Sequence, residues 1–81
     1  MRNEGLTKRE MEVIKLVVSG YSDKGIAKKL FISDYTARTH LVSIYKKLGI
    51  APDTEYNQRV LLVCNVLRKI AEREKNDPTK N

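Results

Sequence analysis

The chain has 81 residues, of which 41% are hydrophobic and 32% are charged, so it is long enough for one small domain and no more. A single cysteine excludes a disulfide framework, and no apolar run is long enough for a membrane span or a secretory leader, which favours a cytoplasmic protein. The formal net charge of +6 favours a polyanionic partner.

The first predicted helix begins after Thr7, behind an N-terminal arm formed by residues 1–5. Thr7 and Glu10 have the spacing of a capping box, in which each side chain satisfies a backbone N–H of the first turn. Gly20 is expected to end the helix, because glycine adopts the left-handed cap at no steric cost. The apolar face recurs at helical spacing and consists of Val13, Ile14 and Val17.

Two further helices follow in quick succession. One runs from Ser22 or Asp23 to about Leu30, with an apolar side formed by Ile26, Ala27 and Leu30 and lysines on the other side. The next covers about residues 34–48, because Ser33 is a suitable N-cap and Gly49 a suitable terminator. Its apolar stripe has spacings of four, three and four residues and consists of Ala37, Leu41, Ile44 and Leu48.

A fourth helix is predicted over about residues 54–74, capped by Asp53 or Thr54, with a frayed tail at 75–81. The stripe expected to face the core is Tyr56, Val60, Val63, Leu67 and Ile70, and Cys64 in the same run is expected to be a buried thiol. A second side is also apolar, which predicts burial against another subunit. The residues expected at this homodimer interface are Leu61, Leu62, Asn65 and Val66; the alternatives are packing against a further domain or a different partner.

The second and third helices, joined by a tight turn, form a helix-turn-helix pattern. Residues 21–50 carry six cations and two acids, so most of the excess positive charge lies in this pair. Opposite the apolar stripe of the third helix lie an arginine, hydroxyls and one valine, which are suited to reading base edges, while lysines suit phosphates. Expected base contacts are Arg38, Thr39 and Val42. Expected backbone contacts are Ser22, Lys24, Lys28, Tyr35, Thr36, His40, Ser43, Lys46 and Lys47.

The sequence from Leu6 to Ile50 resembles the LuxR-type helix-turn-helix domain, which is also the output domain of many response regulators. The matching positions include Leu6-Thr7, Arg9-Glu10, Ser22, Ile26-Ala27, Ser33, Thr36, His40 and Lys47-Leu48-Gly49. The resemblance implies an all-α, four-helix domain over residues 6–74, in which the third helix reads DNA and the fourth mediates dimerisation. One departure is Asp23-Lys24-Gly25, where the family usually has Asn-Lys-Glu.

The function expected from this sequence is sequence-specific binding of double-stranded DNA by a bacterial-type transcription regulator that acts as a homodimer and could contact RNA polymerase. No cofactor, metal, small molecule or membrane is expected as a partner. No catalytic residue is expected either, since the lone His40 has no second ligand or nucleophile beside it. The alternative function is a LuxR-like protein-interaction module that captures a partner through its apolar fourth helix, an idea to which Asp23 and Gly25 give some support.

Overall fold

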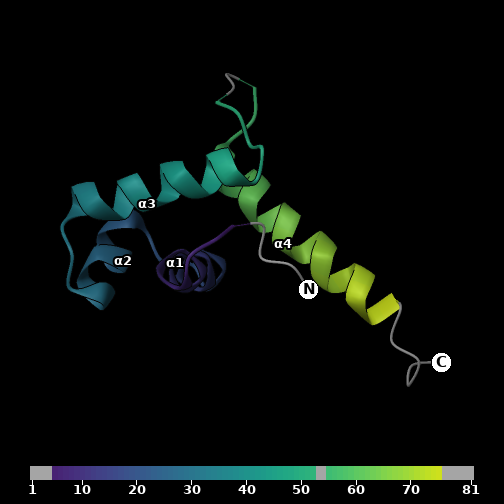
Figure 1. Ribbon diagram of the computed structural model, residues 1–81, viewed down its shortest axis with the longest axis horizontal. Helices are drawn as coiled ribbons and strands as arrows, with labels where there is room; N and C mark the ends of the chain where they lie inside the picture. Colours follow the sequence, from purple (N-terminus) through teal and green to yellow (C-terminus); the bar gives the residue numbers. More distant parts are fainter. Residues whose placement is uncertain (1–4, 53–54, 76–81) are drawn as a thin grey trace. The chain divides into compact units, whose positions relative to one another are not determined.

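The computed structural model describes residues 5–52 and 55–75, which contain four helices and no strand (Figure 1). The helices are α1 (Lys8–Val18), α2 (Asp23–Leu30), α3 (Asp34–Lys47) and α4 (Gln58–Lys75). The predicted all-α class is therefore confirmed. Most of the N-terminal arm, the proposed caps Asp53 and Thr54, and the tail from residue 76 lie outside the described residues.

The first three helices begin at side chains that the sequence identifies as caps. Thr7 and Glu10 form the reciprocal capping box, with the Thr7 hydroxyl accepting from the Glu10 backbone N–H at 3.0 Å and Oε1 of Glu10 accepting from the Thr7 N–H at 2.9 Å. Ser22 and Ser33 accept from the backbone N–H three residues later, at 3.1 and 3.0 Å. These bonds satisfy N–H groups that a helix start leaves unpaired, which fixes where each helix begins.

The chain forms two compact units, of which residues 1–51 hold α1, α2 and α3. Within this unit α3 packs against both α2 and α1 (Figure 1). The predicted apolar faces supply the buried core, although Leu30 and Leu48 are only half-buried. Tyr45 and Ile50, which the periodicity did not single out, are also buried. The core residues of this unit are Val13, Ile14, Val17, Ile26, Ala27, Ala37, Leu41, Ile44, Tyr45 and Ile50.

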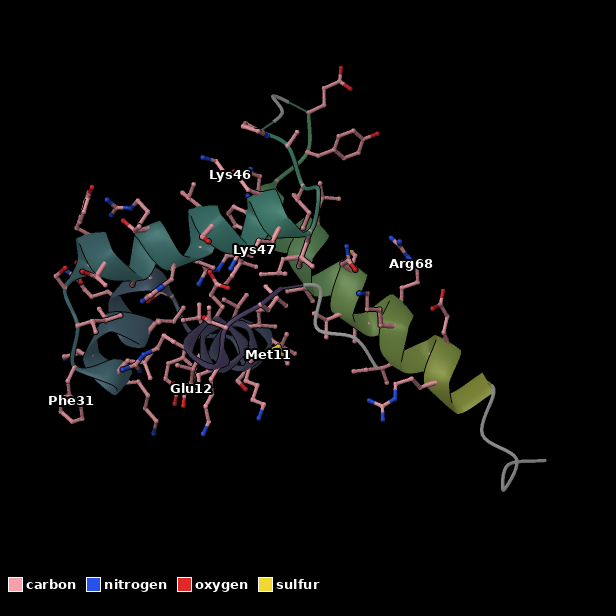
Figure 2. The ribbon with its side chains drawn as sticks, in the orientation of Figure 1. Met11, Glu12, Phe31, Lys46, Lys47 and Arg68 are labelled. Carbon is pink, nitrogen blue, oxygen red and sulfur yellow. The ribbon has the colours of Figure 1, made fainter. Side chains whose placement is uncertain are left out.

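The turn between α2 and α3 is formed by a phenylalanine in a left-handed conformation. Phe31 has φ 58° and ψ 46°, and the following N–H of Ile32 donates to the Ala27 carbonyl at 2.9 Å, which closes the C-terminus of α2. Glycine is the usual residue here, because a Cβ is unfavourable at positive φ. The Phe31 side chain is 94% exposed and points away from the helices (Figure 2). The turn therefore presents an aromatic ring to solvent.

The second unit, residues 52–81, contains α4, and here four predictions are wrong. The helix begins at Gln58 rather than near Thr54, because the Asn57 carboxamide oxygen accepts from the N–H groups of Arg59 and Val60 at 2.9 and 3.2 Å and acts as the cap. The stripe expected in the core is largely exposed, at Tyr56, Val60, Leu67 and Ile70, and Cys64 is exposed as well. Leu62, expected at a dimer interface, is instead fully buried within the chain. A helix with apolar residues on two sides does not reveal from its own pattern which side is covered.

Replacing Ile44 by alanine is expected to lower the free energy of unfolding by about 2–5 kcal/mol. The Ile44 side chain is fully buried, so its truncation would leave a cavity in the core. Urea unfolding followed by far-UV circular dichroism measures the change. Ile44→Val, with an expected loss of about 0.5–1.5 kcal/mol, keeps the measurement accessible if the alanine variant does not fold. The control is Val42→Ala on the exposed side of α3, expected to change stability by no more than about 0.5 kcal/mol.

Candidate nucleic-acid interface

The side of α3 turned away from the core carries the residues expected to read DNA. We call it the outer face of α3; it consists of Tyr35, Arg38, Thr39, Val42 and Lys46, all of them exposed. The Arg38 side chain is 62% exposed and the Val42 residue 46% exposed. The apolar stripe on the opposite side is buried, and no acid occurs from Tyr35 to Lys47. The outer face therefore offers a guanidinium, a methyl-bearing surface and an ammonium, and the only acid of α3 is its first residue, Asp34.

Two threonines of α3 use their hydroxyls within the helix. The Thr39 hydroxyl donates to the Tyr35 carbonyl at 2.9 Å, one turn earlier. Because the hydroxyl bonds the backbone, the methyl group is the part of the Thr39 side chain left for an apolar contact. Thr36 accepts a hydrogen bond from the Ser33 hydroxyl at 2.9 Å and so belongs to the cap of the helix.

The lysines expected at phosphates differ in the direction of their side chains. Lys24, Lys28 and Lys46 are exposed. The neighbours Lys46 and Lys47 diverge at the end of α3: Lys46 points away from α1, whereas Lys47 points toward it (Figure 2). His40, also expected at a phosphate, is half-buried.

A buried carboxylate joins the start of α1 to the end of α3. Glu10 is 4% exposed and accepts hydrogen bonds from the Ser43 hydroxyl at 2.7 Å and from the Lys47 ammonium at 2.8 Å. The same ammonium donates to the Gly5 carbonyl at 3.0 Å. These contacts, together with the capping bond from Thr7, surround the Glu10 carboxylate with donors.

The donors around Glu10 decide its protonation state. Burial by itself raises the pKa of the carboxyl, because it disfavours the charged form. The hydrogen bonds from Lys47, Thr7 and Ser43, with the positive charge of Lys47, outweigh burial and lower the pKa from 4.5 to about 2. Glu10 is therefore ionised at neutral pH, and the ion pair with Lys47 is intact.

This network gives two of the residues expected at phosphates a partner within the chain. Ser43 and Lys47 donate to Glu10, so their donor groups face α1. From the sequence, Glu10 is expected only to cap α1, and its contacts with Ser43 and Lys47 are not predicted. The signal that could have found the network is the spacing of Glu10, Val13, Ile14 and Val17, which places the acid on the buried face of α1. A buried acid requires a cationic partner, and Lys47 supplies it.

A second ion pair lies at the edge of the outer face. Nε of Arg38 is 3.9 Å from Oδ2 of Asp23, the first residue of α2. Both side chains keep contact with solvent, at 62% and 34% exposure. Arg38 therefore bridges α3 to α2 while its guanidinium stays accessible.

Two further features, a metal-ligand cluster and a membrane-spanning helix, concern residues 5–52 and 55–75. In these residues no three His, Cys, Asp or Glu side chains are grouped so as to hold a metal ion. Within the same ranges no helix has the length and apolar character that crossing a membrane requires.

Three capped helices packed together, with a basic outer face on the third, define a helix-turn-helix domain. A match to a known family agrees with this class: residues 4–59 fit the family described as bacterial regulatory proteins, luxR family. This match covers more than half of the chain, and the protein belongs to the luxR family. The predicted family and fold are thereby confirmed, and the family is one of DNA-binding regulatory domains rather than enzymes.

Similar proteins occur in mycobacteria. Two, from Mycobacterium bovis and Mycobacterium tuberculosis, are 45% identical to this chain over 64 residues. Another from Mycobacterium tuberculosis is 51% identical over 64 residues. All three bear the name "Putative HTH-type transcriptional regulator", and each alignment covers 79% of this chain. The chain spans only 7% of the length of these relatives. No solved structure matches the chain.

The pKa of Glu10 predicts how stability depends on pH. The folded value of about 2 lies below the ordinary 4.5, so the ionised carboxylate stabilises the fold fully above pH 4.5, and this contribution is lost as the pH falls from 4.5 toward 2. Glu10→Gln keeps the shape and the cap but not the charge, and we expect it to be less stable by roughly 2 kcal/mol at pH 7. Urea unfolding of both proteins between pH 2 and 7 should show the two stabilities converging below pH 4.5. Parallel profiles would contradict this role of the carboxylate.

Proposed function

We propose that this domain binds double-stranded DNA sequence-specifically as part of a cytoplasmic transcription regulator, with α3 in the major groove. The observation that carries the proposal is the outer face of α3, which is exposed, basic and free of acids from Tyr35 onward. An α-helix fits the major groove, and its partner helix braces it across the backbone. α2 packs against α3 as that arrangement requires.

Each residue of the outer face suits a distinct contact. Arg38 can donate to O6 and N7 of one guanine, which is the commonest specific contact to a base pair. Val42 and the methyl group of Thr39 can pack on the thymine methyl. These three are the proposed base contacts, and they are the ones that the sequence alone predicts.

The proposed phosphate contacts are three exposed lysines, groups at the starts of the two helices, and His40. The N-termini of α2 and α3 carry partial positive charge and unpaired N–H groups, which attract phosphate. Ser43 and Lys47 are left out because they bond Glu10. The proposed set is Ser22, Lys24, Lys28, Tyr35, Thr36, His40 and Lys46.

Arg38→Ala is expected to weaken binding to the preferred sequence by about 1–3 kcal/mol, roughly 5- to 150-fold, because a bidentate contact to guanine is lost. Selection from a random duplex pool supplies that sequence, and fluorescence anisotropy at two salt concentrations measures the affinities, which should fall steeply with salt. Arg9→Ala is the charge-matched control, since Arg9 is exposed on α1 and pairs with Glu12 at 3.3 Å. Equal affinities of wild type and Arg38→Ala would refute the base contact.

The same titration distinguishes DNA binding from the second candidate function, which is that of a protein-interaction module. A protein-interaction module would show no salt-sensitive binding to any duplex, even at low salt. The exposed Phe31 and the exposed apolar residues of α4 are the features that favour this alternative. A regulator bound at a promoter also needs a contact with the transcription machinery, for which RNA polymerase is the proposed partner.

We further propose that two copies associate through the exposed apolar side of α4, which carries Val60, Leu67 and Ile70. Their spacing of seven and three residues places them on one side of the helix. This side replaces the one expected from the sequence, because Leu62 is buried. A two-fold dimer would place two outer faces on two similar half-sites of DNA.

Leu67→Asp is expected to weaken self-association at least about tenfold, because a charge at the centre of an apolar interface would lose its hydration. Sedimentation velocity over a range of concentrations measures the change. Arg68→Asp, one position along the exposed surface of α4, is the control and should leave the association largely intact. A wild-type chain that stays monomeric at all concentrations would contradict the dimer.

A further inference from the structure

Asp23 occupies a position where a negative charge is unfavourable for a DNA-binding surface. It is the first residue of α2, directly after the N-cap Ser22, and its carboxylate lies 3.9 Å from Nε of Arg38. Arg38 is the proposed guanine contact. The acid therefore sits beside the one guanidinium of the outer face, in a region where phosphates would approach.

The contribution of this pair to folding is small. Its two charges are 3.9 Å apart, and both side chains are accessible to water, so solvation offsets most of their attraction. Asp23 also lies at the positive end of the α2 dipole, but the cap itself is made by Ser22, which accepts from the Gly25 N–H. Asparagine keeps the size and polarity of the Asp23 side chain, so we expect the Asp23→Asn variant to fold.

The atoms in contact matter for how Arg38 can bind. The carboxylate lies beside Nε, the guanidinium nitrogen nearest the backbone. The two terminal Nη groups lie at the other end of the planar guanidinium and form the fork that matches O6 and N7 of guanine. A carboxylate near Nε favours a position of the side chain that leaves the terminal fork for a base.

The same carboxylate discriminates between complexes. On a sequence that places guanine opposite Arg38, the terminal fork binds the base while Nε stays near Asp23. On other sequences the only DNA contact open to Arg38 is with a phosphate. To reach it the side chain would turn away from Asp23, and the Asp23 carboxylate would then face the polyanion without its partner. Specificity is a difference between affinities, and an acid that penalises the wrong complex increases that difference.

We propose that Asp23 is a positioning residue that sets sequence specificity: it holds Arg38 through Nε for a guanine contact and disfavours complexes in which Arg38 meets only phosphate. This inference rests on the proposed function of the domain as a DNA-binding module. It concerns a position at which the sequence departs from the Asn of the family pattern, so Asp23→Asn is the natural test.

The test compares affinities for two duplexes of equal length, the one enriched from the random pool and one of mixed sequence. Asp23→Asn should raise the affinity for the mixed-sequence duplex about fivefold, the factor expected when one like charge at roughly 4 Å in water is removed. The affinity for the enriched duplex should rise less than about twofold, because the guanine contact loses its positioning partner. The ratio of the two affinities therefore falls.

Asp34→Asn is the matched control. Asp34 is also the first residue of a helix, follows a serine cap and loses the same charge, so it should shift both affinities by similar factors. The double variant Asp23→Asn/Arg38→Ala tests the route of the effect. Without Arg38, the substitution at Asp23 should leave the ratio of the two affinities unchanged. Thermal unfolding by circular dichroism verifies that each variant is folded.

The outcomes separate the two proposals. A wild-type chain that binds both duplexes, with the affinity ratio unchanged by Asp23→Asn, would overturn the role of Asp23 and leave the proposed function standing. If Asp23→Asn and Asp34→Asn both raise the two affinities by equal factors, the change in affinity comes from net charge alone. That result would also overturn the role of Asp23. A wild-type chain without salt-sensitive binding to either duplex would overturn the proposed function, and the role of Asp23 with it.

Discussion

The buried carboxylate of Glu10 is the constraint on which the orientation of the outer face depends. It ties the first turn of α1 to the last turns of α3 through Ser43 and Lys47. The apolar stripe of α3 also packs in the core, but apolar contacts are not directional. Hydrogen bonds to a single buried carboxylate are directional, so they fix the rotation of α3 about its own axis. That rotation decides which side chains face outward.

Two acids of the first unit, Glu10 and Asp23, pair with different cations and in different environments. Glu10 is buried, where an unpaired charge would be costly, and the partly exposed Lys47 neutralises it. Asp23 contacts Arg38 at the surface, where water screens the pair. Cations of the helix-turn-helix pair are thus divided between a structural role, a base-reading role and a phosphate-binding role. The net charge of residues 21–50, which is +4, does not show this division.

The exposed apolar groups of the molecule lie where contacts with other molecules would form. Phe31 stands at the turn between α2 and α3 in a conformation that a Cβ makes unfavourable, and its ring is almost fully exposed. Val60, Leu67 and Ile70 are exposed on α4. A small domain with little core gains stability from covering such groups. The self-association proposed through α4 would cover Val60, Leu67 and Ile70.

The sequence by itself determined the local structure: the caps at Thr7, Ser22 and Ser33, the apolar stripe of α3, and the exposure of Arg38 and Val42 opposite it. These features depend on neighbours within a few residues, so helical periodicity reveals them. Only the tertiary structure decided that Ser43 and Lys47 face Glu10, because their partner lies 33 and 37 residues away in the chain. It also decided that Leu62 is buried and Leu67 exposed, since the reverse is equally compatible with the pattern. A helical wheel separates a polar side from an apolar one, but only packing assigns partners to each side.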